Sequence, residues 1–138
     1  MSLVLDTSVV VALLVRDDPN HERCLEMGDT LDEELIIPAP TLVEIDYWLR
    51  KHGAGLGWRL FVDEVLEGRY RLHRGDDAEL RRAAQLEATY AELGLGFVDA
   101  SVIATCERLG ERKVATLDRR HFSVVRPQHC DALTLLPT

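Results

Sequence analysis

Strand-like segments alternate with helical patterns along this chain, and no other feature of the sequence constrains the fold as strongly. The strand-like segments are short and bounded by turn residues, and they cover residues 3–5, 34–40, 70–74, 113–118 and 132–137. Strands that alternate with helices favour right-handed crossovers between parallel neighbours. The sequence therefore predicts a three-layer α/β sandwich, with helices on both faces of a central sheet.

Capping residues and glycines predict where the first two helices begin and end. Thr7 or Ser8 is placed to cap a helix over the apolar segment VVVALLV, directly after the first strand. A second helix is expected from Pro19 to Met27, because proline is favoured at a first helical position. Gly28 is the expected stop of this second helix.

The later helices follow the same signals. Thr41 and Glu44 have the spacing of a capping box, and the helix that they open is expected to end at Gly53. Further helices are expected over residues 56–67, from Asp76 and Asp77 onward, and from Asp99 to Gly110. The longest of them carries a stripe of mostly small residues that suggests close packing: Leu80, Ala83, Ala84, Ala88 and Ala91.

Length and composition limit the class of protein. A chain of 138 residues with 46% hydrophobic and 29% charged residues is expected to form one globular domain, residues 1–138. The apolar segment near the start is far shorter than the ~20 residues of a membrane span and lacks the features of a signal peptide. The three cysteines are widely spaced and form no C-x-x-C pair. We therefore expect a cytoplasmic protein with reduced cysteines and no membrane partner.

Four carboxylates stand at boundaries between the predicted elements: Asp6, Glu44, Asp99 and Asp118. In an open parallel sheet, the crevice that binds ligands lies at the carboxyl ends of the strands. Acids gathered there raise one another's pKa and repel each other unless a cation neutralises them. The sequence therefore predicts a metal site with these four residues as the catalytic acids.

Each of these acids also has an ordinary structural explanation. Asp6 and Asp99 are good helix caps, Glu44 fits the capping box, and Asp118 suits a turn. These explanations account for single residues. They do not predict four acids around one edge of a sheet, with neither a lysine nor a histidine at the matching positions.

The spacing of apolar residues along the predicted helices places Asp99 and Glu44 differently. Asp99 lies three and four residues before Val102 and Ile103, so it is expected on the helix face that turns inward. A carboxylate that faces the core needs a partner. Phase does not select Glu44, because Asp46 is the residue that aligns with the apolar face of its helix.

Oxygen ligands favour hard cations, so the acidic site is expected to hold Mg²⁺ or Mn²⁺. Such an ion keeps several waters and bridges to phosphate oxygens, which indicates a phosphodiester or another phosphate compound as substrate. Arg119 and Arg120 directly follow Asp118 and are candidates to bind a neighbouring phosphate. His121 is expected to make a structural hydrogen bond rather than to act as a general acid. The net charge of −8 argues against broad electrostatic binding of nucleic acid, although not against a local basic path.

Four segments, in this order, carry a resemblance to a known family: LVLDTSVVVALL, IIPAPTLVEI, LGLGFVDASVIA and VATLDRRHF. Together they resemble the PIN-domain ribonucleases, and specifically the VapC-type toxins of bacterial toxin–antitoxin pairs. The resemblance spans essentially the whole chain, and the four acidic positions do not depart from the family pattern. The segment EVLEGRYRLHRGDDAEL carries no family motif.

This resemblance implies a PIN-like α/β/α fold whose central, mainly parallel sheet has about five strands. It also implies a Mg²⁺- or Mn²⁺-dependent endoribonuclease in which Asp6 and Asp99 bind the metal, while Glu44 and Asp118 bind it directly or through water. The hydroxyls that would orient these carboxylates or a water belong to Thr7, Ser8 and Thr116. Family members commonly form homodimers and are inhibited by a small antitoxin protein, so we expect both partners in addition to RNA.

Other functions stay open at this point. A PIN domain can also be an RNA-processing nuclease or a catalytically silent binding module, and a small antitoxin gene immediately upstream would favour the toxin. A phosphoacceptor receiver domain is a remote alternative, because it too is doubly wound with acids and Mg²⁺ at a strand edge. Receiver domains use a paired acid after the first strand and a lysine at the end of a late strand, whereas Asp6 stands alone and Lys113 begins its strand.

Overall fold

The central sheet has five strands, and all of its neighbouring pairs are parallel. The computed structural model describes residues 1–138, and the strand order is β3-β2-β1-β4-β5. The strands are β1 (Ser2–Leu5), β2 (Glu34–Pro38), β3 (Arg71–His73), β4 (Lys113–Ala115) and β5 (Thr134–Leu136). The predicted sheet of about five mainly parallel strands is therefore confirmed.

Strand β1 lies at the centre of the sheet and is where the winding direction reverses. Val4 pairs with Ile36 of β2 on one side and with Val114 of β4 on the other. The chain first builds the sheet outward through β2 to β3 and then returns to add β4 and β5 on the opposite side of β1. In such a sheet the ligand crevice lies at the carboxyl ends of the strands beside this reversal, which here are β1 and β4.

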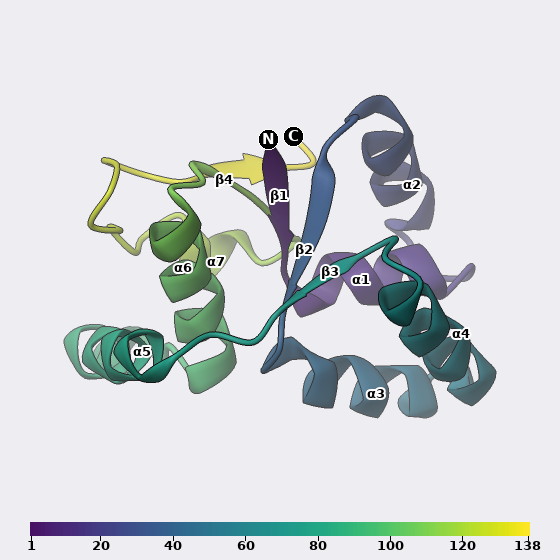
Figure 1. The fold of residues 1–138 in the computed structure, drawn as a ribbon, viewed down its shortest axis with the longest axis horizontal. Helices are drawn as coiled ribbons and strands as arrows, with labels where there is room; N and C mark the ends of the chain where they lie inside the picture. Colours follow the sequence, from purple (N-terminus) through teal and green to yellow (C-terminus); the bar gives the residue numbers. More distant parts are fainter.

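Helices cover both faces of the sheet, as Figure 1 shows. One layer contains α1 (Thr7–Leu14), α2 (His21–Thr30), α3 (Thr41–Lys51) and α4 (Gly55–Leu66). The other contains α5 (Asp77–Thr89), the 3₁₀ turn η1 (Ala91–Leu93), α6 (Phe97–Leu109) and the short α7 (Arg119–Phe122). None of these helices combines the length and the apolar character that a membrane crossing requires.

The pleat of β1 divides the core into two clusters. Leu3 and Leu5 are fully buried among residues of α1, α3 and α4, including Ile45. Val4 points to the other face and packs with residues of α5 and α6, including Ile103. Because successive side chains of a strand alternate between faces, a strand covered on both sides is an unbroken apolar run. This explains why Leu3–Leu5 reads as a short hydrophobic segment rather than as an alternating one.

Helix α2 departs from its predicted ends. It begins two residues later than predicted, because the carboxylate of Asp18 accepts the N–H of Asn20 and holds the chain in a turn. It also continues past Gly28 to Thr30, so the predicted stop is wrong. Burial of Met27 on this helix offsets the helical cost of the glycine, which is about 1 kcal/mol.

The predicted packing stripe of α5 is also wrong. Leu80 is 58% exposed and Ala84, Ala88 and Ala91 are exposed as well, whereas Ala83 and Leu86 are buried against the core. Alanine favours helix formation wherever it stands, so a run of alanines does not mark a buried face. The buried face is the one that carries the large Leu86.

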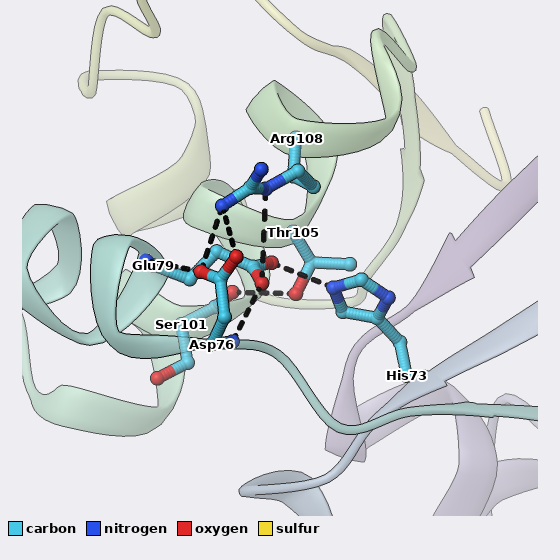
Figure 2. A network of polar contacts seen from close by, with 6 residues as sticks. All are labelled: His73, Asp76, Glu79, Ser101, Thr105 and Arg108. Atoms are coloured by element: carbon cyan, nitrogen blue, oxygen red, sulfur yellow. Dashed lines mark hydrogen bonds and ion pairs between the residues drawn. The ribbon is translucent and has the colours of Figure 1, made fainter.

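A polar network joins the end of β3 to the start of α5 and to α6 (Figure 2). Asp76 and Glu79 form a capping box, in which each side chain accepts the backbone N–H of the other residue. The second oxygen of Glu79 lies 2.6 Å from Nε2 of His73, and Arg108 of α6 donates to both oxygens of Asp76 at 2.6 and 2.7 Å. The network therefore fixes the position of α6, the helix that carries Asp99, relative to the sheet.

We expect Glu79→Ala to lower the free energy of unfolding by about 1–3 kcal/mol, because it removes half of a capping box and leaves the partly buried His73 without its partner. Urea unfolding would measure the change. Gln85→Ala, at an exposed position of the same helix, should change it by no more than about 0.5 kcal/mol. Equal unfolding midpoints for the two variants would contradict the structural role of this network.

Candidate active site

All four predicted acids line one cavity at the carboxyl ends of β1 and β4. The cavity has a volume of about 430 Å³. Asp6 follows β1, Asp118 follows β4, Glu44 comes from α3 and Asp99 from α6. Elements from both helical layers therefore bring carboxylates to the edge of the sheet where the winding reverses.

Asp6 is the most deeply buried of the four acids, with 4% of its surface exposed. It is the N-cap of α1, since its Oδ1 accepts the N–H of Thr7 at 2.8 Å. Its Oδ2 accepts hydrogen bonds from the hydroxyls of Ser8 at 3.0 Å and Thr116 at 2.8 Å. The prediction that Thr7 or Ser8 caps this helix is wrong, because Asp6 takes that role and both hydroxyls are directed into the site.

Burial raises the pKa of Asp6 to about 6, and the negative charge of Asp99 adds to the increase. The three hydrogen bonds that Asp6 accepts act in the opposite direction without cancelling the effect of burial. The pKa of Asp99 is raised as well, chiefly by burial and against the lowering influence of His121. Two neighbouring carboxylates thus resist ionisation, which is the electrostatic condition that a bound cation relieves.

Glu44 reaches the cavity because the predicted capping box does not form. Thr41 is the first residue of α3, and its hydroxyl donates to the carbonyl of Pro38 at 2.7 Å. The carboxylate of Glu44 is left free and accepts a hydrogen bond from the hydroxyl of Thr7 at 2.9 Å. The contact links α3 to α1 and holds Glu44 at the cavity wall.

Helical phase favoured Asp46 over Glu44, and the structure explains the difference. Asp46 pairs with Arg50 one turn later on its own helix, at 3.4 Å, and does not line the cavity. Glu44 is half-buried because α1 passes beside the first turn of α3. The spacing of apolar residues therefore identifies the face of α3 that packs on the core, whereas Glu44 lies on the side of α3 next to α1.

The tightest group of possible metal ligands is formed by Asp99, Asp118 and His121, whose ligand atoms lie within 4.8 Å of one another. Asp99 is the third residue of α6 rather than its cap, which is Gly96. Nδ1 of His121 lies 2.6 Å from Asp99 and 3.4 Å from Asp118. His121 thus makes the hydrogen bond expected of it, and it does so from α7, a four-residue helix that the sequence did not predict.

The predicted hydroxyls form a second layer around the acids. Besides contacting Asp6, the Ser8 hydroxyl accepts the N–H of Leu117 at 3.0 Å, and the Thr116 hydroxyl accepts the N–H of Asp118 at 3.0 Å. These contacts fix the turn that follows β4. Both hydroxyls therefore orient Asp6 through its carboxylate, and the Thr116 hydroxyl also orients Asp118 through its backbone N–H.

The two arginines predicted to bind phosphate lie outside the cavity lining. Both are exposed, and Arg119 donates to the carbonyl of Pro137 at 3.2 Å. Arg120 makes no hydrogen bond or ion pair with other residues of the chain. Only a substrate longer than the cavity could therefore contact both the acids and these side chains.

Four residues that line the cavity were not selected from the sequence, namely Val11, Asp18, Trp48 and Leu117, and Asp18 and Trp48 bear on its chemistry. Asp18 lies on the connection between α1 and α2, in a segment that reads as an ordinary turn. Trp48 lies on α3 one helical turn after Glu44. The i, i+4 spacing from Glu44 was the available signal for Trp48, whereas nothing local marks Asp18.

Comparison with known proteins identifies related chains. The family model of the PIN domain matches residues 3–126. The chain is 29% identical to ribonuclease VapC26 of Mycobacterium tuberculosis, over 98% of this chain and 100% of that protein. Its fold resembles that of VapC20 of the same organism, a toxin that cleaves the sarcin–ricin loop, with a TM-score of 0.82 at 17% identity over 93% and 98% of the two chains. It also resembles a toxin–antitoxin complex from Klebsiella pneumoniae, with a TM-score of 0.64 at 15% identity over 89% and 92%.

The raised pKa of Asp6 predicts how the acidic site affects stability. A pKa of about 6 in the folded state, against 3.8 when unfolded, favours the protonated form, so stability should fall as the pH rises between these values. In EDTA, the free energy of unfolding of Asp6→Asn relative to the native chain should therefore increase by about 2–3 kcal/mol from pH 4 to pH 7. Urea unfolding across this range measures the difference.

Asp29→Asn is the matched control, because Asp29 is exposed on α2 and does not line the cavity. Its difference from the native chain should not change with pH. If the difference in unfolding free energy between Asp6→Asn and the native chain did not change with pH, the Asp6 carboxyl would have the same pKa in the folded and unfolded states. The predicted destabilisation would then be wrong.

Proposed function

This chain belongs to the PIN domain family, and we propose that it is a metal-dependent endoribonuclease that acts as the toxin of a type II toxin–antitoxin pair. The observation that carries the proposal is the convergence of Asp6, Glu44, Asp99 and Asp118 on one cavity beside the winding reversal of the sheet. The full-length similarity to ribonuclease VapC26 supports RNA as the substrate.

The donor set of the cavity fits a hard divalent cation. It offers carboxylate oxygens, which Mg²⁺ and Mn²⁺ prefer. Burial raises the pKa of Asp6 and of Asp99, and the charge of Asp99 adds to the increase at Asp6, so a bound cation would favour the ionised form of both carboxylates. Asp6 and Asp99 would hold the ion, with Glu44 and Asp118 bound directly or through water.

A divalent cation in this position supplies Lewis-acid chemistry, in that it makes a water more nucleophilic and neutralises charge on a phosphate. The protein's own contribution is to hold the acids in place before substrate arrives. Thr7 fixes Glu44, while Ser8 and Thr116 fix Asp6. Hydrolysis then joins the oxygen of a water to phosphorus and breaks one phosphorus–oxygen ester bond, which leaves a phosphate monoester and a hydroxyl.

The proposed partners follow from the same relatives and from charge. The Klebsiella pneumoniae neighbour is part of a toxin–antitoxin complex, which supports a small antitoxin as partner of this chain. A cationic side chain of such a partner would suit a cavity with five acids, counting Asp18. We further expect a homodimer that acts in the cytoplasm, where its RNA substrate is found.

Among the alternatives, the family assignment excludes the receiver-like phosphoacceptor domain. A catalytically silent PIN module is disfavoured because all four acids line the cavity and hydroxyls hold the carboxylates of Asp6 and Glu44. An RNA-processing nuclease would use the same site, so it differs from a toxin only in its partner and its RNA.

Asp99→Asn should abolish RNA cleavage in Mg²⁺ or Mn²⁺, with a loss of at least about 100-fold, because it removes a charged metal ligand from the centre of the acidic group. The assay is cleavage of an RNA pool by the purified protein free of antitoxin, with and without EDTA. Asp29→Asn should cleave like the native chain. Metal-dependent cleavage that survives in both Asp99→Asn and Asp6→Asn would discard this site.

Arg119→Ala and Arg120→Ala should each weaken RNA binding, and by about the same factor for different RNA sequences. Each should also lower the slope of log Kd against the logarithm of the salt concentration by about one. The reason is that a phosphate contact releases counterions without reading bases. Filter binding at several salt concentrations measures the slope. Arg81→Ala, at an exposed position of α5, is the control. A loss of Mn²⁺ affinity with unchanged RNA affinity would refute the phosphate role.

A further inference from the structure

We propose that Trp48 is a nucleobase-binding residue of this site and that its indole ring stacks on a base of the single-stranded RNA whose phosphate lies at the acids. The inference rests on the proposed nuclease function. It assigns a binding subsite for an unpaired nucleotide beside the metal-binding carboxylates.

The first argument is position. Trp48 and the four acids line the same cavity, and Trp48 follows Glu44 by four residues on α3. Residues at this spacing are neighbours on one helix face, with Cβ atoms about 5–6 Å apart. A nucleotide whose phosphate lies near Glu44 can therefore place its base against the indole ring.

The second argument is exposure. Trp48 is 44% exposed, although tryptophan is among the side chains that gain most from burial. The other apolar residues of the cavity are Val11, which is 6% exposed, and Leu117, which is half-buried. Trp48 is thus the one large apolar surface that the cavity presents to a ligand.

The third argument is that the ring is held in place. Tyr47 meets it edge to face, with ring centroids 5.2 Å apart and planes at 85°, and the His52 ring lies 6.5 Å away at 38°. Such aromatic neighbours restrict the indole while leaving part of it open. A pre-positioned ring loses less conformational entropy when a base stacks on it.

The charge of the molecule explains why stacking is needed. The chain has a net charge of −8, and every charged side chain that lines the cavity is acidic, namely the four proposed catalytic acids and Asp18. Phosphate contacts therefore provide little affinity unless a cation is present, whereas stacking of a base on an aromatic ring does not depend on charge. Stacked bases on tryptophan are also how proteins commonly hold unpaired RNA.

The test compares variants of Trp48 in cleavage of a pool of RNA hairpins with randomised loops, in Mn²⁺. Trp48→Ala should raise KM for the pool by about 5- to 100-fold, the range expected for loss of one stacked base. It should also weaken the nucleotide preference beside the cut, read by sequencing the products, and leave Mn²⁺ affinity unchanged. Trp48→Phe, which retains an aromatic ring, should restore most of the KM and the preference.

Leu60→Ala is the control, because it removes an exposed apolar side chain of α4 that does not line the cavity. It should change KM by no more than about twofold. Emission from Trp48 gives an independent readout in Trp58→Phe, which has Trp48 as its single tryptophan. RNA should quench this emission.

Several outcomes would overturn the inference. Unchanged KM and nucleotide preference in Trp48→Ala would do so, as would an equal loss in Leu60→Ala. Trp48→Ala that cleaves RNA normally but no longer binds its antitoxin would assign the ring to a protein interface instead. If the native protein cleaved no RNA in Mn²⁺, the proposed function itself would fail, and that failure is visible before any Trp48 variant is made.

Discussion

The carboxylate of Asp6 is withdrawn from water where β1 ends, and the arrangement of the neighbouring elements compensates for that burial. A carboxylate in this position needs hydrogen-bond donors, and it receives them from the backbone of α1, from Ser8 and from Thr116 at the end of β4. Each donor belongs to an element that must be in place before Asp6 can be accommodated. The central strand, the first helix and the β4 turn are therefore coupled through one side chain.

The remaining acids are held by pairwise contacts that cross between elements. Thr7 of α1 holds Glu44 of α3, and His121 of α7 holds Asp99 of α6. Burial raises the pKa of Asp6 and of Asp99, and the hydrogen bonds that these carboxylates accept do not cancel its effect. Burial of these carboxylates lowers the stability of the protein at neutral pH, and the two buried core clusters supply the compensating stability.

If RNA is the substrate, as proposed, different parts of the site would contact it in different ways. An acidic protein that acts on a polyanion must rely on a cation, on isolated basic side chains and on contacts without charge. The acids would hold the cation, and a substrate longer than the cavity would reach Arg119 and Arg120 outside it. Trp48 provides an aromatic surface within the cavity. This division explains how a net charge of −8 is compatible with an RNA substrate.

Local patterns in the sequence were enough to predict the order of the strands and of the longer helices, the parallel sheet and the placement of four acids at its carboxyl edge. They were enough because strand and helix periods are local, and parallel strands share one edge. Contacts between distant parts of the chain set the rest: Glu44 accepts a hydrogen bond from Thr7, His121 lies beside Asp99 and Asp118, and Asp18 and Trp48 line the cavity. They also set which face of α5 is buried. These features depend on contacts between residues far apart in the chain, which no local pattern of side chains records.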